Sequence, residues 1–141
     1  MKVYCSILRP AMGALALAMA SALCAQQHSF YTRPDIHGDM VAFTCEGDLW
    51  LASITNGQAR RITSDVGVER NARFSPDGTM IAFNGQYDRA GEVYVMPVIG
   101  GAPRRLTYDP SGPVVLGWTP DSKSIIYRSS HESTSSYINK L

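Results

Sequence analysis

Phe74-Ser75-Pro76-Asp77-Gly78-Thr79-Met80-Ile81-Ala82-Phe83 is the stretch that decides the fold, because a sharp turn leads directly into an apolar segment. The proline fixes φ at the first central position of a type I turn, the aspartate can bond the local backbone, and Gly78 takes the last position without steric cost. Gly91-Glu92-Val93-Tyr94-Val95 and Arg104-Arg105-Leu106-Thr107 follow it. Their β-branched and aromatic residues predict further strands of one antiparallel unit.

The same unit occurs once before this stretch and begins once after it. Its earlier copy comprises residues 38–43, 47–51 and 60–63, and its later copy comprises residues 118–122 and 125–127. Phe43 and Phe83 stand 40 residues apart, whereas Thr63 and Thr107 stand 44 apart. We attribute the difference to a four-residue insertion in a predicted loop over residues 84–90. No segment carries the sustained apolar spacing of an amphipathic helix, so a repeat of this length predicts the blade of a β-propeller.

The sequence therefore predicts an all-β fold, a partial β-propeller of about two and a half four-stranded blades. Residues 26–141 form this incomplete propeller, with blade 1 at about 34–63, blade 2 at about 74–107 and blade 3 at about 118–141. The strand after each turn is almost wholly apolar, which is expected when neighbouring blades cover both of its faces. The third copy stops inside its unit, so we expect the chain to be part of a longer protein.

The first 25 residues have the anatomy of a secretory signal peptide. Lys2 and Arg9 precede an apolar run over residues 11–22, and Ala20-Ser21-Ala22 supplies the small residues of a cleavage site. Cleavage is expected after Ala22 or Ala25. The run is too short for a membrane anchor, since spanning ~30 Å of hydrocarbon at ~1.5 Å per residue takes about 20 residues. The mature protein is therefore expected to be exported, to the periplasm or the medium.

Charge and cysteine content exclude several classes of protein. The formal net charge is +1 and becomes −1 once Lys2 and Arg9 are removed, so no excess of basic residues indicates nucleic acid or an anionic membrane surface as a partner. Of Cys5, Cys24 and Cys45, cleavage after Ala25 leaves only Cys45. One cysteine cannot form an internal disulfide, and we expect Cys45 to be a small buried hydrophobic residue.

Residues that could carry chemistry do not form a recognisable site. His28, His37 and His131 lack the spacing of a zinc site, and there is no Gly-x-Ser-x-Gly elbow or phosphate-binding glycine-rich loop. Asp88-Arg89 is interpreted as a solvated loop tip rather than as a ligand contact at the rim of a propeller. Matching strand positions at Trp50 and Tyr94 favour core packing over ligand stacking. We therefore predict no catalytic, cofactor-binding or metal-binding residue in this chain.

The ordered set of segments resembles the N-terminal part of tricorn-type proteases. The resemblance is carried by Phe30-Tyr31-Thr32-Arg33-Pro34-Asp35-Ile36, by residues 38–51 and 95–107, and by Trp118-Thr119-Pro120-Asp121 with Tyr127-Arg128-Ser129. It implies a six-bladed propeller that filters or channels peptides toward a serine peptidase core near the C-terminus of the family's proteins. Peptides or unfolded polypeptides, further blades and a peptidase domain would then be the partners. None of the family's catalytic residues has a counterpart in this chain.

Two other exported propellers remain as alternatives. A TolB-like periplasmic protein would be an interaction module without an attached enzyme, although such proteins place a mixed α/β domain ahead of the blades. A prolyl-oligopeptidase relative would carry a Gly-x-Ser-x-Gly sequence further along the chain. The Ser-Pro-Asp-Gly turn alone is shared by all three groups.

Overall fold

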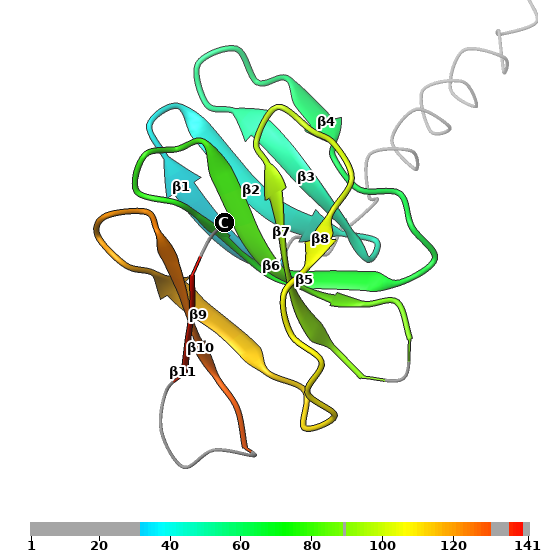
Figure 1. The fold of residues 1–141 in the computed structure, drawn as a ribbon. Coiled ribbons are helices and arrows are strands. Elements are labelled where there is room, and N and C mark those ends of the chain that lie inside the picture. The colour runs from blue at the N-terminus through cyan, green and yellow to red at the C-terminus, as the bar shows by residue number, and fades with distance from the viewer. Residues whose placement is uncertain (1–31, 89, 131–135, 140–141) are drawn as a thin grey trace, which may run out of the picture.

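The computed structural model describes residues 32–88, 90–130 and 136–139, and the regular structure in these ranges is entirely β-strand. The strands form three antiparallel sheets that lie next to one another (Figure 1). The first sheet has the order β1(Thr32–His37), β2(Met40–Cys45), β3(Asp48–Ser53), β4(Ala59–Arg61). The second has the order β5(Val68–Phe74), β6(Met80–Gln86), β7(Glu92–Pro97), β8(Arg104–Arg105). The third has the order β9(Val114–Trp118), β10(Ser124–Arg128), β11(Ser136–Asn139).

Strand pairing confirms that the two earlier copies of the repeat are equivalent. Phe43 of β2 stands opposite Trp50 of β3, and Phe83 of β6 stands opposite Tyr94 of β7. The same residue types therefore occupy the same register in successive sheets. Register is fixed wherever a sheet face is buried, because a slip of one residue would turn every side chain to the other face.

The predicted turn has the predicted geometry. Gly78 N donates to the Ser75 carbonyl oxygen at 2.8 Å and has a φ of +69°, and Thr79 N donates to Asp77 Oδ1 at 3.0 Å. In the third sheet Ser122 takes the place of the glycine, with a φ of +60°. The glycine is free to adopt this left-handed backbone, whereas a serine there is strained.

Three boundaries differ from the sequence prediction. The third sheet begins at Val114 rather than at about residue 118, because β9 precedes its turn and pairs with β10. The second sheet begins at Val68 rather than near the turn, because β5 precedes the turn and pairs with β6. The β6 strand extends to Gln86, so Asn84 is a strand residue and not part of a loop over residues 84–90. The β5 strand was missed because Glu69, Arg70 and Asn71 interrupt the apolar pattern by which strands are recognised.

Apolar residues hold successive sheets together. The interface between the first and second sheets buries Ala42, Leu49, Leu51, Ala72, Phe74, Ile81, Phe83, Tyr94 and Met96. The interface between the second and third sheets buries Ala82, Val93, Val95, Val115, Trp118 and Ile125. The second sheet is thus covered on both faces, which confirms the expectation drawn from its apolar β6 strand. Full burial of one such large side chain contributes about 1.5–3 kcal/mol.

A threonine joins the last segment of each unit to the third strand. Leu49 N donates to Thr63 Oγ1 at 2.8 Å, and Val93 N donates to Thr107 Oγ1 at the same distance. An arginine two residues earlier reinforces the contact: Arg105 pairs with Glu92 at 2.7 Å, and Arg61 with Asp48 at 3.1 Å. The repeated Arg-Arg-apolar-Thr sequence therefore closes the outer edge of a sheet.

Replacing Thr107 by Val should loosen this edge. The substitution keeps the shape of the side chain but leaves the buried Val93 N–H without its acceptor, at a cost of about 1–3 kcal/mol. We expect faster amide hydrogen exchange at Val93, measured by NMR or mass spectrometry. Thr79→Val is the matched control, because the Thr79 hydroxyl bonds Asp77 at an exposed turn. Unchanged protection of Val93 in Thr107→Val would contradict the role of the threonine.

Candidate functional site

The first strands of the three sheets lie side by side. β5 contacts both β1 and β9, and each of these strands stands at one end of its sheet and therefore has an edge without a sheet partner. We call β1, β5 and β9 the leading strands. Each pairs irregularly with the next strand, with a shift in register between Thr32 and Asp35, between Arg70 and Arg73, and opposite Ile126 and Tyr127. Such bulges interrupt strand pairing and redirect side chains.

Left-handed residues mark two of these bulges. Arg33 in β1 and Asn71 in β5 both have a φ of +55°. Asparagine tolerates this backbone, but for an arginine it costs of order 1–3 kcal/mol. In the fold, the bulge brings Arg33 of the first sheet against Asn71 of the second, and the Arg33 guanidinium donates a hydrogen bond to the Asn71 side-chain oxygen.

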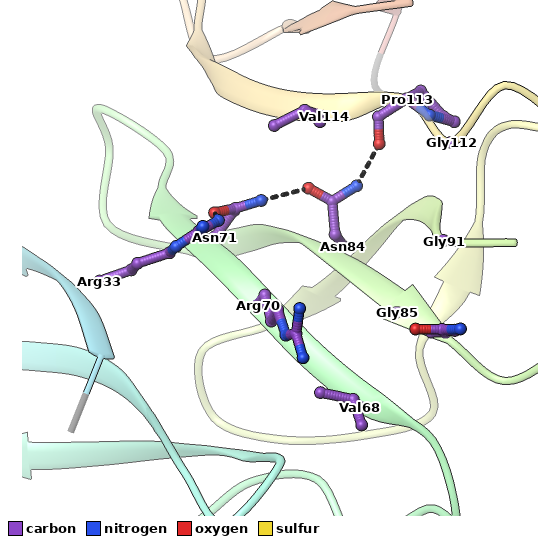
Figure 2. A pocket seen from close by; sticks show the side chains of 11 residues that line it. Arg33, Val68, Arg70, Asn71, Asn84, Gly85, Gly91, Gly112, Pro113 and Val114 are labelled. Atoms are coloured by element: carbon purple, nitrogen blue, oxygen red, sulfur yellow. Dashed lines mark hydrogen bonds between the residues drawn. The ribbon is translucent and has the colours of Figure 1, made fainter. Parts of the chain in front are cut away.

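A pocket of about 240 Å³ opens where the leading strands meet (Figure 2). The polar side chains in its wall are Arg33, Arg70, Asn71, Asn84 and Gln86. Gly91 and Gly112 also line it, and a Cβ atom added at either position would meet no other atom within 4 Å. The pocket is therefore reachable from solvent past backbone that carries no side chain.

Asn84 fixes one wall of this pocket by bonding to two other strands. Its side-chain oxygen accepts from Asn71 Nδ2 at 2.9 Å and from Val115 N at 3.0 Å, and its Nδ2 donates to the Pro113 carbonyl oxygen at 2.6 Å (Figure 2). The amide is buried and engages both its oxygen and its nitrogen. A fully satisfied buried polar group of this kind holds its neighbours in one arrangement.

The two arginines differ in how they are held. Arg33 is tied to Asn71, and through it to Asn84, so its guanidinium has a defined position. Arg70 is exposed and makes no hydrogen bond or ion pair with any residue in the described ranges. The pocket thus combines one positioned and one unpaired cation.

Glu69 lies next to the pocket but is turned into the protein, where it is fully buried. Its Oε2 accepts from Thr63 Oγ1 at 3.0 Å, while its Oε1 and the buried Tyr87 hydroxyl have no hydrogen bond of good geometry in the described part of the chain. Burial raises the pKa of the Glu69 carboxyl above its usual range, and the nearby hydroxyls of Tyr87 and Thr63 only partly oppose this. Burial and this carboxyl likewise raise the pKa of Tyr87.

The structure places the residues weighed in the sequence away from this pocket. Asp88 pairs with Arg105 at 3.4 Å on the outer side of the second sheet, and His37 packs against Phe74 with ring centroids 5.8 Å apart. Cys45 and Tyr94 are buried, as expected, and Trp50 is partly buried. Cys5, Cys24, His28, Arg89, His131 and the predicted signal peptide over residues 1–25 lie outside the described residues.

Sequence reasoning missed the five polar residues of the pocket. One signal was present. Glu69-Arg70-Asn71 lies between the end of the first unit at Thr63 and the Ser-Pro-Asp-Gly turn, and this segment is long enough for one more strand. Within residues 32–88, 90–130 and 136–139, no three His, Cys, Asp or Glu side chains are grouped as a metal site would require. The same ranges contain no helix long and apolar enough to cross a membrane.

Comparison with known proteins identifies the fold. The family model of the tricorn protease N-terminal beta propeller domain matches residues 28–141. Tricorn protease homolog 1 of Streptomyces coelicolor is 45% identical over 91 residues, which are 64% of this chain and 8% of that protein. The crystal structure of the tricorn protease matches with a TM-score of 0.63 and 33% identity, over 70% of this chain and 11% of that one. These matches confirm the predicted propeller fold and the predicted family.

TolB from Acinetobacter baumannii shares the fold as well. Its crystal structure matches with a TM-score of 0.68 and 22% identity, over 77% of this chain and 29% of that one. The chain spans only 8% of the length of the Streptomyces coelicolor relative, so most of that protein lies outside the match.

The buried carboxyl of Glu69 predicts a specific pH dependence. Its folded-state pKa lies above the ordinary value of 4.5, so its favourable contribution is complete below that value and is lost as the pH rises through the folded-state pKa. We expect the wild-type chain to lose stability relative to Glu69→Gln as the pH is raised. Urea midpoints of both proteins between about pH 4 and about pH 8 measure this.

Tyr87→Phe extends the test. Its hydroxyl lowers the pKa of Glu69, so removing it should extend the loss of stability to higher pH. Parallel curves for the wild type and Glu69→Gln would contradict the assignment of a raised pKa to Glu69.

Proposed function

Since this chain belongs to the family of tricorn protease N-terminal β-propeller domains, we propose that it forms the first blades of an exported, tricorn-like serine peptidase and binds or gates its peptide substrates. In this proposal the first and second sheets are complete four-stranded blades and the third is part of another, about two and a half in all. The remaining blades and the peptidase domain would be supplied by a longer protein.

The observation that carries this proposal is the pocket at the meeting point of the leading strands. It is open to solvent, it is about 240 Å³ in volume, and its wall presents guanidinium donors. Such groups bind polypeptides through hydrogen bonds and do not perform covalent chemistry by themselves. A role in selecting or guiding peptides therefore fits this part of the chain better than a role in cleaving them.

A TolB-like interaction module is the second candidate. The likeness to the TolB fold is the observation in its favour, and it concerns the fold alone. The two functions differ in the expected ligand. A substrate gate binds unfolded polypeptides of many sequences, whereas an interaction module binds one folded partner. An exported prolyl-oligopeptidase relative would also bind unfolded polypeptides of many sequences and would differ only in its peptidase domain.

Binding of an unfolded polypeptide tests the gate. We expect the chain to bind a fluorescein-labelled unfolded polypeptide, measured by anisotropy, and to bind the folded form of the same polypeptide much more weakly. Gly91→Trp places a large ring at the pocket mouth where no atom lies within 4 Å of the new Cβ. It should weaken binding by about tenfold or more, which corresponds to about 1.4 kcal/mol.

Ser64→Trp is the control for this substitution. Ser64 is exposed in the segment between β4 and β5 and does not line the pocket, so an added tryptophan there should leave the affinity unchanged. Equal binding by Gly91→Trp and the wild type would place the polypeptide site elsewhere. Binding of the folded polypeptide alone would favour the interaction module.

Export and the larger parent protein are tested together. An antibody against residues 74–95 should detect a periplasmic or secreted product several-fold larger than the 15.4 kDa of this chain. N-terminal sequencing of the product should begin at Leu23 or Gln26, according to which alanine precedes the cut. A cytoplasmic product of 15.4 kDa that retains Met1 would contradict both parts of the proposal.

A further inference from the structure

The pocket between the leading strands holds two guanidinium groups and no carboxylate. We infer that it recognises acidic side chains of the bound polypeptide, each carboxylate being received by Arg70 and Arg33. This inference rests on the proposed function, because it names the kind of polypeptide that the gate prefers. It adds a site to a region in which the sequence indicated none.

Arg70 provides the free charge. It projects from β5 into the pocket region (Figure 2), it is exposed, and no residue in the described ranges bonds or pairs with it. A guanidinium has five N–H donors in a planar fork that fits the two oxygens of a carboxylate. An unpaired arginine at the wall of a pocket can offer this fork to a ligand without first breaking an internal contact.

Arg33 provides the positioned charge. The hydrogen bond to Asn71 uses one arm of its guanidinium, and Asn71 is held in turn by Asn84. Because Asn84 also bonds to Val115 and Pro113, the chain of contacts runs from the first sheet to the third. A donor that is fixed before the ligand arrives loses less conformational entropy on binding.

The acidic residues near the pocket are already engaged. Asp35 in β1 lies 3.6 Å from Arg73, and Glu92 in β7 lies 2.7 Å from Arg105. Glu69 is buried on the far side of β5 and bonds to Thr63. None of these three carboxylates lines the pocket, so the positive potential of the two arginines is not cancelled from within the wall.

The bulges explain why side chains, and not the backbone, carry the recognition. An extended polypeptide could add to the open edge of a leading strand only if that edge offered a regular row of donors and acceptors. All three leading strands are irregular in their pairing, and bulges of this kind disrupt such a row. Charged side chains at the bulges then become the groups that a passing polypeptide meets.

Three labelled peptides of equal length test the inference with the full chain. The first carries internal glutamates and an amidated C-terminus, the second carries glutamines with the same amide, and the third carries glutamines with a free C-terminal carboxylate. We expect the glutamate peptide to bind about tenfold or more tighter than the amidated glutamine peptide, as charge-assisted hydrogen bonds allow. The preference should weaken as salt is added.

Substitution of Arg70 distinguishes binding at this pocket from nonspecific attraction by the net charge of the protein. Arg70→Gln should reduce the affinity for the glutamate peptide to that for the amidated glutamine peptide, and Arg70→Glu should reverse the preference toward a lysine peptide. Arg104→Gln removes the same charge from β8 at the outer edge of the second sheet and should leave the preference intact. An unchanged preference in Arg70→Gln would overturn the inference.

The remaining outcomes are also decisive. Binding that requires only the free C-terminal carboxylate would overturn the assignment to acidic side chains. Equal binding of all three peptides would overturn the inference and leave the proposed gate standing. Failure of every peptide, together with the unfolded polypeptide, would overturn both.

Discussion

A β-sheet with apolar residues on both faces cannot remain alone in water, and this constraint governs the whole arrangement. The second sheet meets it by packing Phe83 and Tyr94 against the first sheet and Val93 and Val95 against the third. Each sheet therefore owes its stability to its neighbours, as in other repeat architectures. Packing of the apolar faces sets the position of each sheet. The turns, the threonine contacts and the arginine pairs then make smaller contributions to stability and fix the register of the strands within a sheet.

The candidate site forms where this apolar contact ends. Ala82 of β6 still belongs to the apolar interface with the third sheet, while Asn84, two residues further on the same face, bonds to Pro113 and Val115. One strand thus passes from apolar packing to polar contacts at the candidate site within a single alternation of side chains. In β5, one step along the strand likewise separates the buried Glu69 from the exposed Arg70, so neighbouring residues face the protein interior and the candidate site.

The sequence predicts the local parts of this structure and not the site. The turn over residues 75–78, the apolar strands and the equivalence of Phe43 with Phe83 all follow from short-range patterns, and the structure bears them out. The sequence does not predict β5, because its residues are largely polar. They are buried only because the neighbouring sheets cover them. The pocket cannot be predicted from short-range patterns at all. Asn84 bonds to Val115, 31 residues later in the chain, only once the second and third sheets have packed.

The bulges have a consequence for how such a protein can change over time. Arg33 and Asn71 take up matching irregular positions in successive sheets, and neither belongs to the apolar clusters between the sheets. Arg33 is exposed, so its exchange alters the wall of the candidate site while the packed interfaces keep their shape and volume. Duplication of a unit therefore supplies a new sheet and, with it, a new side chain at the edge of a leading strand that is free to diverge. In this architecture the side chains at the leading edges can therefore change one unit at a time, without a corresponding loss of folding stability.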